Sequence, residues 1–233
     1  MGHKVSPIIH RIPAVNVWDS KWFARRENMS EWLRQEVAIR TLLAKQLKEA
    51  GIGAVSVERT AKDVTITILA AKPGAVIGRN GQGLDAIRKD IERNILRFKT
   101  KVRLNIQAVT QPALCAEVIG QGAALEIEKR MPFRRVMKQI IEKAMAAGAQ
   151  GVKVSMSGRL NGAEIARREV LSQGKMSLIT IRSNVDYAIV EANTIYGKIG
   201  IKVWIYRGES FGRKDKFAVA NEADAKQAAD KKR

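Results

Sequence analysis

A glycine-rich loop at residues 77–83 contains residue types that could hold an anion. Its sequence is Ile-Gly-Arg-Asn-Gly-Gln-Gly, so Gly78 and Gly81 enclose Arg79 and Asn80. Glycines let a backbone pass close to phosphates, and a helix that begins directly after them offers unpaired N–H groups and the positive end of its dipole. The loop therefore favours contact with a phosphate backbone over a plain turn, which would use the same residues.

Two other phosphate-binding motifs do not fit this loop. A dinucleotide-binding fingerprint runs Gly-x-Gly-x-x-Gly directly after a strand and needs an acidic residue about 20 positions later. Here the spacing is reversed and no strand leads into it. A Walker loop is excluded because the sequence has no Gly-Lys-Ser or Gly-Lys-Thr. A GXXG loop in front of a helix is the arrangement with which KH modules clamp a nucleic-acid backbone.

A second basic group lies on a predicted helix at residues 133–147. Arg134, Arg135 and Lys138 fall on the side away from its apolar stripe, and residues 129–143 hold six basic side chains against one acidic side chain. Most charges on such a face only solvate a helix. Because the density is high and the arginine fork suits phosphate, we interpret this group as a phosphate contact.

Further arginines are weaker candidates. Residues 158–168 interleave glycines with Arg159, Arg167 and Arg168. This pattern suits a loop laid against RNA, but an ordinary hairpin explains it equally well. Arg88, on the helix that follows the glycine loop, is added to the expected RNA-binding residues.

The four tryptophans could stack on bases, as exposed rings do in proteins that bind single strands. Burial in a core is the more common role of this residue. Trp204 alternates with apolar neighbours in a predicted strand, so we expect it to be buried. For Trp18, Trp22 and Trp32 the sequence does not decide between these roles.

The composition points to a polyanionic partner. The 233 residues include 42 Lys and Arg against 23 Asp and Glu, a formal net charge of +19. Such an excess repels itself in a compact chain unless a polyanion neutralises it. No stretch reaches the roughly 18 apolar residues of a spanning helix, and no apolar secretory block is present near the start. We expect a cytoplasmic chain that binds nucleic acid and no membrane.

Neither catalysis nor metal binding is indicated. His3 and His10 are isolated, and together with the lone Cys115 they cannot form a dedicated zinc site or an internal disulfide. A nuclease would need metal-binding carboxylates or an activated nucleophile, and neither can be identified. We therefore expect no cofactor, no metal and no enzymatic activity.

Hydrophobic periodicity predicts an α+β chain whose first domain covers residues 29–110 and has the order helix, strand, strand, turn, helix, strand. The expected elements are a helix from Asn28 or Ser30 to about residue 50, strands at 55–57 and 64–68, a turn at 75–78, a helix at 84–95 and a strand at 102–106.

A second α/β domain is predicted over residues 111–208, with two helices packed on a mixed sheet. Its expected elements are helices at 112–131 and 133–147 and strands at 152–156, 165–172, 178–183 and 201–206. Residues 1–28 show no sustained period and are predicted to form an extended arm. Residues 209–233 contain few aromatic or branched side chains and are predicted to form a disordered tail.

Several long motifs occur in a specific order along nearly the whole chain. They lie at residues 1–7, 18–24, 71–81, 133–138, 154–167 and 194–205. In this order they resemble the bacterial type of the small ribosomal subunit protein three family. The resemblance implies a type II KH domain, with the order α-β-β-α-α-β, followed by an α/β domain. Both would be bound to ribosomal RNA in the head of the small subunit, with one copy of the protein in each ribosome.

The resemblance also implies functions for individual residues. Those matching Arg134, Arg135 and Lys138 line the channel through which messenger RNA enters and help to open structured messages. The implied protein partners are small-subunit proteins ten and fourteen, with protein two close by. Two features depart from the family pattern: Asn80 is neutral where many relatives have a basic residue, and the tail after Phe211 follows no family pattern. The alternative is a free KH-domain regulator of transcription or RNA turnover.

Overall fold

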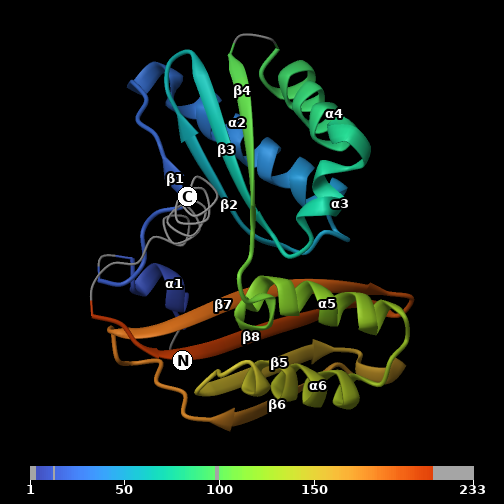
Figure 1. Cartoon of the computed structure of the whole chain (residues 1–233). Coiled ribbons are helices and arrows are strands. Elements are labelled where there is room, and N and C mark those ends of the chain that lie inside the picture. Colours follow the sequence, from blue (N-terminus) through green and yellow to red (C-terminus); the bar gives the residue numbers. More distant parts are fainter. Residues whose placement is uncertain (1–3, 13, 98–99, 212–233) are drawn as a thin grey trace, which may run out of the picture. The chain divides into compact units, whose positions relative to one another are not determined.

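The computed structural model describes residues 4–12, 14–97 and 100–211 (Figure 1). Their contacts divide the chain into two units, one formed by residues 18–110 and the other by residues 4–17 together with 111–211. The predicted tail lies outside the described residues from residue 212 onward. Each unit is described by itself.

The unit of residues 18–110 is a four-stranded sheet covered by helices. Its elements are β1 (Ser20–Lys21), α2 (Arg26–Gln46), β2 (Ile52–Arg59), β3 (Asp63–Ala70), α3 (Pro73–Ile77), α4 (Gln82–Asp90), a π-helical turn (Ile91–Ile95) and β4 (Lys101–Ala108). The strand order is β1-β2-β3-β4. The β2–β3 pair is antiparallel, and the two outer pairs are parallel. The predicted α-β-β-α-α-β order is confirmed from α2 to β4.

The apolar side chains of the strands and of the helices pack into one core in this unit. Val64, Ile66 and Ile68 alternate inward along β3 and are at most 1% exposed. They pack with Leu43 of α2 and with Ile91, which follows α4. The core therefore fixes where α3 and α4, and the glycine loop between them, lie on the sheet.

The second unit places two helices on another four-stranded sheet. Its elements are α1 (Pro7–His10), α5 (Ala116–Glu128), α6 (Phe133–Ala146), β5 (Gly151–Gly158), β6 (Arg167–Gly174), β7 (Ser183–Thr194) and β8 (Gly197–Glu209). The strand order is β6-β5-β8-β7. Figure 1 shows α5 and α6 on the same face of this sheet, with α5 along β7 and β8 and α6 along β5 and β6.

The sheet of this unit was predicted to be mixed, but all three strand pairs are antiparallel. Both helices precede the strands, so no helix links one strand to a parallel neighbour, and parallel pairing needs such a crossover. The strand predicted at 178–183 is also wrong, since these residues form a connection and β7 begins at Ser183. β7 was missed because small residues, Ala188 and Ala192, occupy its inward positions.

The prediction that the N-terminal residues form an extended arm is also corrected by the structure. Its first part forms α1 and belongs to the second unit, where Arg11 is 1% exposed. The Arg11 guanidinium donates hydrogen bonds to the carbonyls of Leu178 at 2.7 Å and Thr180 at 3.0 Å. The last part forms β1 and the start of α2 in the other unit. Elements of two and four residues are too short to show a hydrophobic period, so no sequence pattern could predict them.

The predicted helix from Pro112 is interrupted. Pro112 begins a 3-10 turn that ends at Leu114, and α5 starts only after the extended residue Cys115. None of the helices in the described ranges is both long and apolar enough to cross a membrane.

Candidate nucleic-acid interface

The glycine loop joins α3 to α4 through a 3-10 turn, Arg79–Gly81. Gly78 has φ +71° and Gly81 has φ +79°, a region that favours glycine. A Cβ on Gly83 would lie 2.9 Å from the carbonyl oxygen of Val76, so this glycine allows α3 and α4 to approach closely. A Cβ on Gly81 would meet no atom within 4 Å. The backbone at Gly81 is therefore open to an approaching ligand.

The charge at this loop comes from one exposed guanidinium. Arg79 is exposed, whereas the side chain of Asn80 lies outside the described residues. Arg88, further along α4, forms an ion pair with Glu92 at 3.2 Å. The Glu92 carboxylate also accepts a hydrogen bond from the backbone N–H of Val102. Arg88 is thus partly neutralised, whereas Arg79 has no ion-pair partner among the described residues.

The basic group on α6 lies on the solvent side of a helix with a strongly apolar inner face. Val136 and Met137, on the inner face of α6, are completely buried. Arg134, Arg135 and Lys138 are exposed. Neither Arg135 nor Lys138 has an ion-pair partner among the described residues, so both can bind an external anion.

Arg134 is oriented by a carboxylate that the sequence did not single out. Its guanidinium donates two hydrogen bonds to the carboxylate oxygens of Glu169 on β6, at 3.1 and 3.2 Å. These bonds raise the pKa of Arg134 and lower the pKa of Glu169. Arg167 lies 3.6 Å from the same carboxylate. Both guanidinium groups are 5.8 Å from the ring of Phe133. The fold therefore brings together two arginines that are far apart in the sequence.

The other two candidates of this unit lie elsewhere. Arg168 points to the opposite face of β6 from Arg167, because successive strand side chains alternate, and its Nε donates to Ser155 Oγ at 3.0 Å. Arg159 Nε donates to the carbonyl of Ala163 at 2.9 Å. Its guanidinium is 5.4 Å from the ring of Tyr196. The predicted arginines thus form at least two separate groups.

The tryptophans have different environments. Trp204 is 7% exposed, which confirms its predicted burial. Trp22 and Trp32 pack edge to face with ring centroids 5.9 Å apart. The Arg59 guanidinium lies 4.1 Å above the Trp32 ring. Trp18 is 64% exposed, so its ring is accessible from outside.

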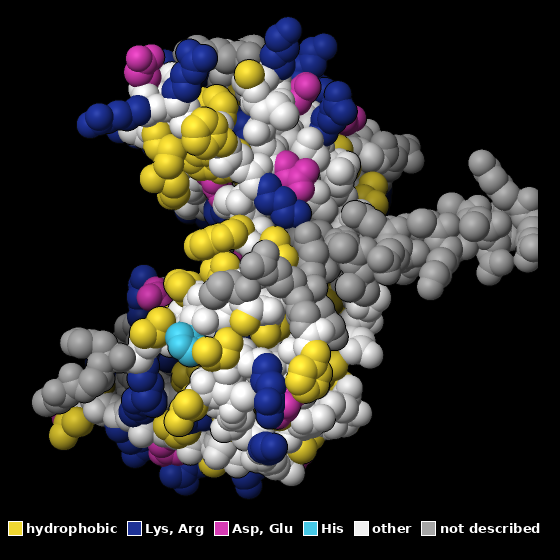
Figure 2. Space-filling model, turned by 90° about the vertical axis from the view of Figure 1, so that its left-hand side faces the viewer, with side chains coloured by type: hydrophobic (Ala, Val, Ile, Leu, Met, Phe, Trp, Pro, Cys, Tyr) yellow, Lys and Arg dark blue, Asp and Glu magenta, His cyan; other side chains and the backbone are white. Residues whose placement is uncertain are grey.

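Basic side chains are spread widely over the molecule. Figure 2 shows Lys and Arg over the surfaces of both units, with fewer Asp and Glu on this face. In the described part of the chain, no three His, Cys, Asp or Glu side chains gather into a group that could hold a metal ion. The geometry therefore suits many separate contacts with an extended polyanion.

The comparisons with known proteins agree with this geometry. Residues 38–114 match the family model of the KH domain, and residues 123–205 match that of ribosomal protein S3, C-terminal domain. A small ribosomal subunit protein uS3 of Chromobacterium violaceum is 44% identical over 90% of this chain and 88% of its own length. The chain belongs to the ribosomal protein S3 family. The predicted resemblance is therefore confirmed.

Two further relatives of the S3 family are equally similar. The uS3 protein of Desulforamulus reducens is 45% identical over 90% of this chain and 93% of its own length. That of Streptococcus pneumoniae is 46% identical over 90% of this chain and 94% of its own length. The glycine loop lies in the part that matches the KH model, and α6 with β6 lies in the part that matches the S3 model.

Proposed function

We propose that this chain is a structural component of the small ribosomal subunit that binds ribosomal RNA in the subunit head. The observation that carries the proposal is the similarity, over 90% of the chain, to proteins named as small ribosomal subunit proteins. In this proposal residues 29–110 act as a KH domain and residues 111–208 as a second RNA-binding domain. The chain is cytoplasmic and ribosome-bound, in one copy per ribosome.

The glycine loop positions RNA rather than reading its sequence. Gly78 and Gly81 supply the positive φ that shapes the loop, the open backbone at Gly81 lets RNA approach, and Arg79 supplies the charge. Phosphate contacts of this kind fix register and orientation but carry no base information. Arg88, Arg159, Arg167 and Arg168 extend the ribosomal RNA contacts.

The basic group on α6 handles messenger RNA in this proposal. Arg134, Arg135 and Lys138 line the channel through which the message enters and attract the phosphates of its single strand. Holding one strand of a hairpin by its backbone favours the unpaired state, which helps to open structured messages. Support comes from the exposure of all three side chains and from Arg135 and Lys138, which have no ion-pair partner among the described residues. Glu169 partly neutralises Arg134 but holds it in a fixed direction. The protein partners in this proposal are small-subunit proteins ten, fourteen and two.

Sedimentation of cell extracts tests this proposal against a free KH-domain regulator of transcription or RNA turnover. Tagged protein should travel with small subunits after washing at moderate salt. Recovery of the protein only in the soluble fraction would favour the regulator instead.

We expect the affinity of the isolated protein for RNA to fall steeply with salt. Each neutralised phosphate releases counterions, so six or more contacts would cost roughly a thousandfold in affinity between 50 and 200 mM salt. Filter binding of a ribosomal RNA fragment at four salt concentrations measures the slope. An affinity that stays constant across this series would contradict the electrostatic interface.

Arg79→Asp should weaken RNA binding about tenfold, because a charge-assisted hydrogen bond contributes roughly 1.5 kcal/mol or more. The melting temperature should not change, since the side chain is exposed. The matched control is Lys62→Asp, a charge reversal at the opposite end of β3 from the glycine loop. If both reversals weaken binding equally, the loop has no special role in holding the backbone.

A further inference from the structure

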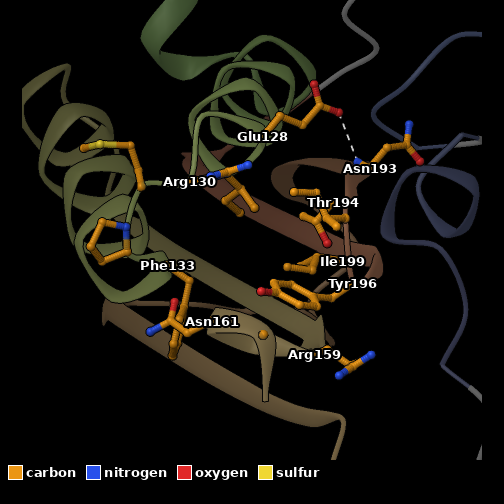
Figure 3. A pocket seen from close by; sticks show the side chains of 14 residues that line it. Glu128, Arg130, Phe133, Arg159, Asn161, Asn193, Thr194, Tyr196 and Ile199 are labelled. Atoms are coloured by element: carbon orange, nitrogen blue, oxygen red, sulfur yellow. Dashed lines mark hydrogen bonds between the residues drawn. The ribbon is translucent and has the colours of Figure 1, made fainter. Parts of the chain in front are cut away.

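A pocket of about 570 Å³ opens on the second unit where three separate segments meet (Figure 3). The segments are the turn between α5 and α6, the 3-10 turn after β5 and the hairpin between β7 and β8. Its apolar floor is formed by Ile127, Met131, Phe133 and Ile199. A volume of this size suits a group as large as one nucleotide.

One aromatic ring stands in the wall of this pocket. Tyr196, on the β7–β8 turn, is 55% exposed. One side of its ring packs against Gly162, where a Cβ would come within 2.9 Å of Cε2. Figure 3 shows the ring between Arg159 and Asn161 on one side and Thr194 on the other. The ring is therefore held in place and still offers surface for stacking.

Polar and cationic groups surround the ring. The side chains of Asn161 and Asn193 line the pocket. Arg130 and Arg159 also line it, and neither has an ion-pair partner among the described residues. The single acidic lining residue, Glu128, accepts a hydrogen bond from the backbone N–H of Asn193 at 3.0 Å. The pocket thus combines two guanidinium groups and two amides with the exposed ring of Tyr196.

The rim also holds unusual backbone conformations. Of the non-glycine residues with positive φ in the described ranges, Arg97, Arg130 and Asn161, two line this pocket. Asn161 has φ +56° and Arg130 has φ +63°. Such conformations cost free energy and tend to occur where a site must hold a side chain in a given direction.

We propose that this pocket binds one unpaired nucleotide of RNA, with the base stacked on Tyr196, its polar edge at Asn161 and Asn193, and the adjoining phosphates at Arg130 and Arg159. Proteins recognise unpaired RNA bases by stacking them on aromatic rings and bonding their edges. The two guanidinium groups have no ion-pair partner among the described residues, and this free positive charge favours a nucleotide over a peptide side chain. This proposal rests on the proposed function, because it assumes that the chain binds RNA.

The test uses the full chain and five RNA hairpins that differ only in one bulged position. That position carries adenosine, cytidine, guanosine, uridine or an abasic residue, so all five hairpins have equal charge. At least one of the four hairpins that carry a base should bind about tenfold more tightly than the abasic hairpin, which is the effect expected from stacking on a ring. Tyr196→Ala should abolish this preference, and Tyr196→Phe should retain it. Asn161→Gly, which tolerates the positive φ, should change which base is preferred.

Each outcome bears on a different claim. If no base exceeds the abasic hairpin, or if Tyr196→Ala keeps the preference, the pocket proposal is overturned while salt-dependent RNA binding continues to support the proposed function. If the unaltered chain bound none of the RNAs, both the pocket proposal and the proposed function would be overturned. Ultraviolet cross-linking of assembled small subunits should join Tyr196 to a nucleotide, whereas a cross-link to a peptide would identify a protein occupant and overturn the proposal.

Discussion

Replacing Arg134, Arg135 and Lys138 with alanine together should slow ribosomes on hairpin-containing messages and lower the salt slope of single-stranded RNA binding by about two. In the proposed function each residue supplies one phosphate contact, and a contact with a single strand contributes roughly 0.7 to that slope. The fold should be retained, since the three side chains are exposed and the Glu169 carboxylate keeps Arg167 as a partner. The direct readout is the elongation rate on matched messages with and without a hairpin.

A matched control removes the same charge elsewhere. Lys153, Lys175 and Lys202 lie outside α6, so their joint replacement by alanine removes three positive charges from the same unit. The ratio of rates on structured and unstructured messages should stay normal in this control. If the α6 variant slows both messages equally, its residues do not act on hairpins.

Glu36→Ala should destabilise the unit of residues 18–110 by about 2 kcal/mol, because it removes charge-assisted hydrogen bonds from a buried carboxylate. Glu36 is 7% exposed. It accepts hydrogen bonds from Ser20 Oγ, from Trp22 Nε1 at 2.6 Å and from Arg40 Nε at 2.9 Å. These partners tie β1 and the following segment to α2. Hydrogen exchange of peptides from α2 and β2 measures the local opening free energy.

The same carboxylate gives this unit a dependence on pH. Burial raises the pKa of Glu36, but the hydrogen bonds from Ser20, Trp22 and Arg40 together with the Arg40 charge outweigh it, so the net pKa is lowered. A carboxylate whose pKa is lowered in the folded state stabilises the fold at pH values above the ordinary glutamate pKa of about 4.3. This stabilisation is lost as the pH falls through the folded-state pKa. Glu36→Ala should therefore remove part of the acid sensitivity.

The control for Glu36 is Glu58→Ala. Glu58 forms an exposed ion pair with Lys21 at 3.5 Å, and such pairs contribute at most about 1 kcal/mol. Its loss should leave both the opening free energy and the acid sensitivity nearly unchanged. Equal effects of the two substitutions would mean that the Glu36 network does not stabilise the contact between β1 and α2.

The sequence by itself determined the features that depend on neighbouring residues. The period of two in β2 and β3 and the period of 3.6 in α6 decided which side chains are inside, and hence that Arg134, Arg135 and Lys138 face solvent. The glycines of the loop at 78–81 were recognisable because their conformational freedom is a property of each residue. The order of the motifs along nearly the whole chain indicated the family.

Only the tertiary structure decided which distant residues meet. Glu169 approaches Arg134 because β6 lies beside α6, and no local pattern encodes that distance. The pocket around Tyr196 likewise needs three segments whose separations in the sequence carry no period. Very short elements such as α1 and β1 exist because Arg11 and Glu36 bind them to residues elsewhere in their units. Periodicity measures the burial of one segment at a time, whereas these sites arise from contacts between segments, which only the folded chain establishes.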